Sequence, residues 1–146
     1  FTPDAVVRSG DGVMNARGRD ALIAQYRDRF RALGPGAHYM HDVAIWLDSS
    51  DTDRLPDTAR LKVSGHAELW RNGQMMVVGL RYDDTCRLTA EGWRFAERVI
   101  QYLYYCPVQD YPGILGRAER NLAYATPSAA DVPENTATWK AYHADA

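Results

Sequence analysis

The amino-acid sequence predicts an α+β fold, in which a strongly curved, mixed or antiparallel sheet wraps around a helix and encloses one apolar pocket. Three observations predict it. Four long segments of strand character follow one another from residue 38 onward, tight turn signals join them, and one amphipathic helix precedes them. The 146 residues, 46% of them hydrophobic and 25% charged, suffice for one domain with its own core.

The first elements are short. Residues 5–8 predict a strand, residues 9–12 a turn, and residues 13–14 the start of a return strand. A helix should follow Gly18, and a stop signal at residues 34–36, Gly-Pro-Gly, should end it. Its apolar stripe recurs at three- and four-residue spacing and comprises Leu22, Ile23, Tyr26, Phe30 and Leu33.

The four long strands are expected at residues 38–48, 59–70, 74–88 and 93–105, with a polar loop at residues 49–57. Asn72-Gly73 is typical of a two-residue type I′ turn. Ala90-Glu91-Gly92 suits a three-residue turn that ends in a left-handed glycine.

Prolines interrupt the chain from Pro107 onward. We expect a short helix or irregular turn at residues 112–122 and then a tail that Trp139 and Tyr142 anchor. Residues 1–106 would form the domain, and residues 107–146 a C-terminal extension packed on it.

The turns predict the register and therefore the two faces of the sheet. The first turn pairs Leu69 with Met76, and the second pairs Asp84 with Arg98. The inner face should be apolar and aromatic, and should hold Val63, Gly65, Ala67, Leu69, Met76, Val78, Leu80, Tyr82, Ile100, Tyr102 and Tyr104. The outer face should be polar apart from a corner of Val77, Leu103 and Tyr105, which predicts a homodimer through this face.

Composition excludes several kinds of partner. The formal charge is -2, and the apolar runs are too short to span a bilayer, so we expect neither a nucleic-acid nor a membrane partner. Cys86 and Cys106 should lie near opposite ends of neighbouring strands and remain free thiols. Free thiols indicate a reducing, cytoplasmic location.

Three motifs carry a resemblance to a known family. They are Gly18-Arg19-Asp20-Ala21-Leu22-Ile23, then His38 to Asp42, and then the hairpin segments at residues 80–84 and 92–98. Their order and spacing resemble the SnoaL-like branch of the nuclear transport factor 2-like superfamily, over residues 1 to about 105. The resemblance implies a cystatin-like cone with one pocket, and relatives that include polyketide cyclases, ketosteroid isomerases and scytalone dehydratase.

The resemblance also implies site residues. His38 matches the base histidine of the dehydratase and dehydrochlorinase members, Arg98 matches a pocket arginine, and Asp84 its companion aspartate. In those relatives, an N-terminal helix carries the carboxylate that orients the histidine, and we expect that helix to precede Phe1. Regular pairing of the neighbouring strands would place His38 and Arg98 at opposite ends of the strand at residues 59–70. The resemblance instead places both residues in one pocket. We follow the resemblance, because the loop at residues 49–57 does not determine the register of the first two long strands.

These residues predict a cofactor-independent lyase or isomerase, of dehydratase or cyclase type, that acts on a small apolar cyclic or polyketide-like molecule. His38 would be the base, and Arg98 with Asp84 the polar anchor. The substrate would contact Tyr82, Tyr102, Val63, Val78, Leu80 and Ile100.

Alternatives remain open. The domain could be a non-catalytic ligand-binding or dimerisation module, or an accessory subunit of a larger oxygenase. His66 is a weaker catalytic candidate, because the register places it on the outer face. A metal site of His38 and His41 would need a β-bulge and lacks further ligands, so no metal is expected.

Overall fold

The computed structural model describes residues 1–48 and 55–144, so most of the predicted polar loop lies outside the described residues. Its elements are, in chain order, β1 (Val6–Ser9), β2 (Asn15–Arg17), α1 (Arg19–Arg31), β3 (Leu33–Asp48), β4 (Thr58–Arg71), β5 (Gln74–Thr89), β6 (Gly92–Pro107), η1 (Val108–Gly116), β7 (Glu119–Asn121), β8 (Ser128–Ala129) and α2 (Ala137–Ala144). The main sheet runs β2-β1-β6-β5-β4-β3. It is mixed, because β1 lies parallel to β6 and the long strands are antiparallel. The α+β prediction is confirmed.

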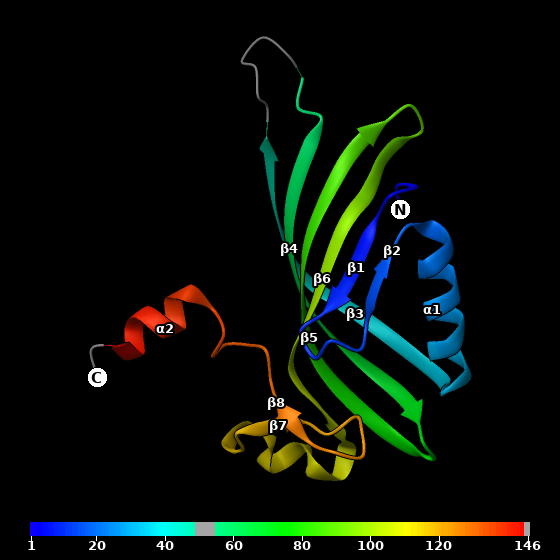
Figure 1. Ribbon diagram of the computed structural model, residues 1–146. Coiled ribbons are helices and arrows are strands. Elements are labelled where there is room, and N and C mark those ends of the chain that lie inside the picture. The colour runs from blue at the N-terminus through cyan, green and yellow to red at the C-terminus, as the bar shows by residue number, and fades with distance from the viewer. Residues whose placement is uncertain (49–54, 145–146) are drawn as a thin grey trace.

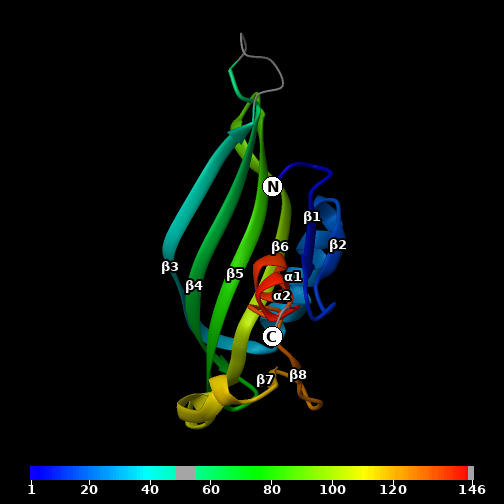
Figure 2. The same ribbon diagram turned by 90° about the vertical axis from the view of Figure 1, so that its left-hand side faces the viewer.

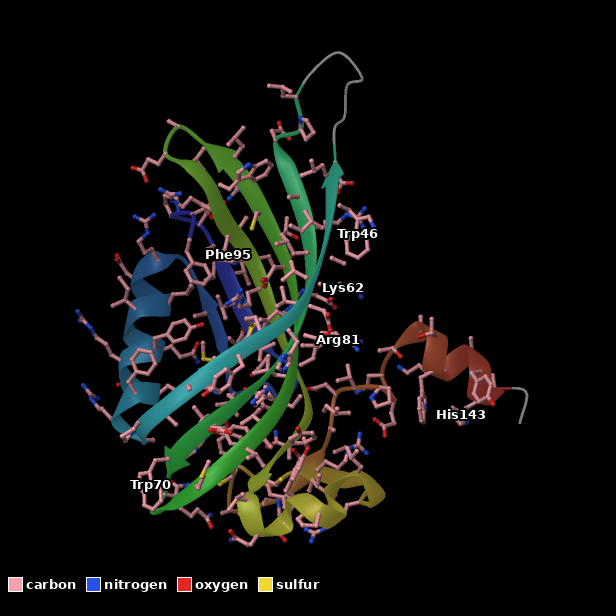
Figure 3. The ribbon with its side chains drawn as sticks, turned by 180° about the vertical axis from the view of Figure 1, so that it is seen from behind. Trp46, Lys62, Trp70, Arg81, Phe95 and His143 are labelled. Carbon is pink, nitrogen blue, oxygen red and sulfur yellow. The ribbon has the colours of Figure 1, made fainter. Side chains whose placement is uncertain are left out.

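The sheet is long, twisted and curved, and α1 lies against one of its faces while α2 extends from the other (Figure 1). Figure 2 shows β3 to β6 bending together along their length. Side chains confirm the two faces: Phe95 points to the side of α1, whereas Lys62 and Arg81 point to the side of α2 (Figure 3). The face that α1 covers is called the inner face below, and the opposite one the outer face.

Helix α1 ends earlier than its stop signal predicts. Its last residue is Arg31, and the chain enters β3 at Leu33, so residues 34–36 belong to the strand. Glycine is needed there because a Cβ on Gly34 would lie 2.8 Å from Cδ1 of Trp70, and one on Gly36 would lie 2.7 Å from Cδ2 of Leu69. The glycines therefore permit close strand pairing instead of ending the helix.

The β4–β5 hairpin has the predicted register throughout. Asn72 and Gly73 form the turn with positive φ angles of 53° and 77°. Leu69 pairs with Met76 and Leu61 with Asp84. This part of the prediction is confirmed because a type I′ turn leaves only one pairing for the flanking residues.

The β5–β6 pairing is as predicted in its centre and differs at both ends. The turn has two residues, since Thr89 pairs with Gly92, and a bulge at Ala96 restores the predicted pairing of Asp84 with Arg98. A second bulge, at Leu103, adds one residue to β6 and shifts the pairing that follows it. Gly79 therefore pairs with Tyr104 and Val78 with Tyr105, so each of these tyrosines lies on the face opposite to the predicted one.

The placement of two tyrosines is consequently the reverse of the prediction. Tyr105 is buried on the inner face and does not belong to an outer corner with Val77 and Leu103. Tyr104 lies on the outer face, where its ring covers Gly79: a Cβ at that position would lie 2.7 Å from Cε1 of Tyr104. The missing side chain of Gly79 makes the space that the Tyr104 ring occupies.

The inner face, α1 and the β1–β2 hairpin share the hydrophobic core. Its buried members include Val7, Met14, Leu22, Ala67, Leu69, Met76, Val78, Leu80, Ile100, Tyr102 and Tyr105. Cys86 and Cys106 are both buried free thiols, as expected. In the described part of the chain, no helix has the length and apolar character that crossing a membrane requires.

The C-terminal extension packs on the sheet only as far as its last helix. Arg120 is buried and donates hydrogen bonds to the carbonyls of Leu103 at 2.9 Å and Val132 at 3.1 Å, and it pairs with Glu134 at 2.6 Å. Helix α2 buries none of its residues, and Tyr142 is 78% exposed. The predicted anchor of Trp139 and Tyr142 is therefore wrong, because buried Arg120 and its bonds hold the extension instead.

Candidate functional site

A cavity of about 90 Å³ lies between α1 and the inner face of the sheet. Six of the predicted site residues line it: His38, Val78, Leu80, Tyr82, Ile100 and Tyr102. Tyr26, Arg29 and Phe30 of α1 close it from the other side. The lining is mostly apolar and aromatic, with an imidazole, a guanidinium and phenols as its polar groups.

His38 reaches this cavity from β3, the edge strand, where it pairs with Ala67. His38 is an exposed residue although its side chain lines the cavity. Partial burial lowers the pKa of the imidazole below its usual value, and the positive charge of Arg29 lowers this pKa further. Both effects favour the neutral imidazole at neutral pH, which is the form that can accept a proton.

Arg29 is a polar group of the cavity that the sequence analysis did not select. Its Nη2 donates a hydrogen bond to the hydroxyl of Tyr102 at 3.3 Å. Within the described ranges 1–48 and 55–144, no carboxylate forms an ion pair with it. The signal for its position was present, because Arg29 follows Leu22 by seven residues and Tyr26 by three, which places it on the helix stripe.

Two tyrosines supply hydroxyl groups to the same cavity. Burial raises the pKa of Tyr102 to about 12, against the opposing effect of the nearby Arg29. Burial also raises the pKa of Tyr82, although Arg98 opposes it. Both phenols therefore stay protonated at neutral pH and can donate hydrogen bonds to an oxygen atom in the cavity.

Asp84 and Arg98 form a separate feature. Arg98 binds both carboxylate oxygens of Asp84, through Nε at 2.8 Å and Nη2 at 2.7 Å. Its guanidinium lies 4.2 Å from the ring centre of Tyr82 and 4.5 Å from that of Phe95. The Asp84 side chain is fully buried, and that of Arg98 is 19% exposed.

The structure does not bring this ion pair to the cavity. Neither Asp84 nor Arg98 lines it, and neither does Val63, which is buried in the sheet opposite Tyr82 and Val43. On β4, His38 is opposite Ala67 whereas Asp84 is opposite Leu61. These six residues correspond to about 20 Å along the strand at about 3.3 Å per residue. His38 and Arg98 are therefore far apart, as regular strand pairing predicts, and they do not share one pocket as the resemblance implies.

A hollow larger than the inner cavity lies on the outer face, beside the C-terminal extension. It measures about 550 Å³ and contains His41 and His66, whose Nε2 and Nδ1 atoms lie 2.6 Å apart. Strand alternation from His38 places His41 on the outer face, where His66 lies as predicted, and the bulge at His41 changes the faces only of the residues that follow it. The described residues contain no group of three or more histidine, cysteine, aspartate or glutamate side chains that could hold a metal ion.

Comparison with solved structures supports the fold. A protein of Novosphingobium aromaticivorans, named as a candidate aromatic ring hydroxylase, is 23% identical with a TM-score of 0.64, and the match covers 75% of each chain. A candidate scytalone dehydratase from the same organism is 17% identical with a TM-score of 0.63, and the match covers 86% of this chain and 77% of the other. A type 2 hexachlorocyclohexane dehydrochlorinase is 14% identical with a TM-score of 0.64, over 74% of this chain and 70% of the other.

At these identities the similarity describes the fold alone. No curated protein matches this chain. The sequence itself matches the SnoaL-like domain over residues 1–99, which is more than half of its length. The chain therefore belongs to the SnoaL-like domain family.

Proposed function

We propose that this protein is a cofactor-independent lyase or isomerase that removes a proton from a small, largely apolar cyclic substrate, with His38 as the base. The observation that carries the proposal is the environment of His38. The imidazole lines an apolar cavity, its pKa is lowered by partial burial and by Arg29, and hydrogen-bond donors surround the same space. Two solved structures of similar fold have names that denote eliminations, a dehydratase and a dehydrochlorinase.

In this proposal, the neutral imidazole takes a proton from a carbon atom next to a carbonyl group. The electron pair of that C–H bond moves toward the carbonyl oxygen, which becomes negatively charged. The hydroxyl of Tyr102 and the guanidinium of Arg29, which are already hydrogen-bonded to each other, stabilise the charge. The imidazolium then returns the proton to another carbon, or a leaving group departs. Arg98 with Asp84 is not used, because the pair lies outside the cavity.

One observation favours a second candidate, a binding module without catalysis. The cavity of about 90 Å³ is smaller than the roughly 300–1,000 Å³ of typical ligand sites. A small cavity suits a ligand that enters only in part, and His38 is partly open to solvent at the strand edge. In this alternative, ligands bind next to His38 but no proton is transferred.

Hydrogen–deuterium exchange separates the two candidates. The protein is incubated in D₂O with small cyclic ketones such as 2-tetralone, and exchange at the carbon next to the carbonyl is followed by proton NMR. We expect faster exchange with the natural protein than with His38→Gln. His143→Gln is the matched control, because His143 lies exposed on α2, away from the cavity. Equal exchange with the natural protein and His38→Gln, together with ligand-induced shifts of the His38 resonances, would favour the binding module.

A further inference from the structure

A second hollow of about 280 Å³ lies next to the inner cavity, near the end of α1. Arg29 lines both spaces and therefore forms the boundary between them. The other polar side chains of the second hollow are Arg71 from the end of β4, Tyr124 from the C-terminal extension, and Gln25 and Asp28 from α1. We call this second hollow the arginine chamber.

Arg71 is held in the chamber by aromatic groups. Its Nη1 donates a hydrogen bond to the hydroxyl of Tyr105 at 3.0 Å. Its guanidinium lies 4.8 Å from the ring centre of Tyr124 and 5.5 Å from that of Tyr105. The Nε atom of Arg71 is buried, and within the described residues it has no hydrogen-bond partner. A planar donor group is thus oriented while part of its hydrogen-bonding capacity remains unused.

The charges of the inner-face arginines are compensated unequally. Arg98 is neutralised by a bidentate bond to Asp84. Arg29 and Arg71 form no ion pair with a carboxylate in the part of the chain that the structure describes, and their partners are phenols. Both arginines are half-buried. A charge that is partly removed from water and has no opposite charge beside it is disfavoured, so a site of this kind gains when an anion enters it.

The nearby carboxylates are engaged elsewhere. Asp28 lines the chamber, but it pairs with Arg31 at 2.8 Å. Asp11 accepts a hydrogen bond from the side chain of Asn121 at 3.2 Å. Asp131 accepts one from the backbone N–H of Tyr102 at 2.8 Å. None of these carboxylates forms an ion pair with Arg29 or Arg71, which leaves both guanidinium groups available to a ligand.

We propose that the arginine chamber binds the carboxylate of a small apolar acid, whose apolar body extends past Arg29 into the inner cavity beside His38. The proposal rests on the proposed function and names its substrate class. Guanidinium groups match the planar geometry of a carboxylate and bind it through two parallel hydrogen bonds. The two spaces share Arg29 as a lining residue, so a ligand that reaches past its side chain would occupy both, and the inner cavity then needs to hold only part of the ligand.

The test compares an acid with its neutral amide of nearly equal shape. Cyclohexanecarboxylate and cyclohexanecarboxamide are titrated into the protein by calorimetry at pH 7.5. We expect the acid to bind at least about tenfold more tightly than the amide, the size of one lost charge-assisted hydrogen bond. Arg71→Gln should reduce this preference without weakening the amide, because only Arg29 remains, and Arg71→Lys, which keeps the charge, should retain more of it. Arg60→Gln is the control, because Arg60 is an exposed arginine on the same strand.

Several results would overturn the proposal. One is equal affinity of the natural protein for the acid and the amide, or binding of neither. This result needs only the natural protein, so it does not depend on whether a variant folds. If Arg71→Gln is folded by circular dichroism and keeps the full preference for the acid, the arginine chamber is not the site. If inorganic phosphate binds more tightly than the acid and Arg71→Gln abolishes its binding, the ligand is a phosphate and not a carboxylate.

The binding test is independent of catalysis. His38→Gln should still prefer the acid over the amide, because the anion contacts Arg29 and Arg71. Loss of deuterium exchange in His38→Gln with the preference intact supports both proposals. A preference without any His38-dependent exchange supports the chamber and contradicts the proposed function. His38-dependent exchange without the preference contradicts the chamber alone.

Discussion

Replacing Arg98 by methionine should destabilise the protein strongly, because it leaves the carboxylate of Asp84 buried without its partner. Asp84 is fully buried and accepts both of its close hydrogen bonds from Arg98. Removing one member of such a buried pair costs about 3–5 kcal/mol. For a chain of this length, each kcal/mol corresponds to about 2–4 °C, so the melting temperature should fall by about 6–20 °C.

A double-mutant cycle tests this reasoning. The free energy of unfolding is measured by urea titration for Arg98→Met, for Asp84→Leu and for the double variant. The double variant should recover much of the loss, because two apolar side chains of similar size replace the whole pair. Arg60→Met is the matched control: it breaks the exposed pair with Asp48, at 2.6 Å, and should cost only about 0–1 kcal/mol.

Two outcomes would refute this interpretation of the pair. One is a cost for Arg98→Met no greater than that for Arg60→Met. The other is a double variant that is as unstable as the sum of the two single variants. Either result, combined with weaker ligand binding by Arg98→Met, would favour the role of substrate anchor that the family resemblance suggests.

Four further predictions follow from the same contacts. Arg29→Met should raise the pKa of His38 toward its usual value of about 6.5, since the charge that disfavours the imidazolium is removed; NMR titration measures this, and an unchanged or lower pKa would contradict it. Gly79→Ala should lower the free energy of unfolding by about 1–3 kcal/mol, because the new Cβ would lie 2.7 Å from the ring of Tyr104. In urea titrations, adding Tyr104→Ala should restore part of this stability. A double variant that is no more stable than Gly79→Ala would argue against the clash. Deleting residues 137–146 should leave the melting temperature unchanged, since α2 buries none of its residues, and a large decrease would reveal packing of this helix against another molecule. The homodimer remains a proposal: light scattering should give twice the 16.4 kDa chain mass, and a monomer at high concentration would exclude it.

The fold was predictable where local turn chemistry determines long-range pairing. Asn72-Gly73 determines the β4–β5 register, and from that register follows the inner-face position of Val78, Leu80 and Tyr82. Because side chains alternate between the two faces of a strand, this register also predicted most of the strand residues that line the cavity. The prediction ended where a strand contains an extra residue, because a bulge leaves no signal in an alternating pattern.

The bulge at Leu103 shows how much one residue changes. With it, Tyr105 enters the core and meets Arg71, whereas Tyr104 covers Gly79 on the outer face. Without it, the hydroxyl that orients Arg71 would face the other side of the sheet. The alternation of side chains along β6 therefore could not predict the arginine chamber, because the bulge decides on which face Tyr105 meets Arg71. Arg29 escapes prediction for a different reason: the stripe places it on the helix face toward the sheet, but the spacing alone does not show whether a long charged side chain lines a cavity or reaches solvent.

The two ends of the inner face consequently have different roles in this interpretation. At the end marked by Leu61, an arginine is neutralised by a buried aspartate and enclosed between aromatic rings, which leaves it little capacity for a ligand. At the end marked by Arg71, two arginines have phenols as partners and lie beside an open space. A charge that is already satisfied stabilises the fold, whereas a charge held in place but not neutralised is able to bind. The same residue type thus supports structure at one end of the sheet and, by our proposal, recognition at the other.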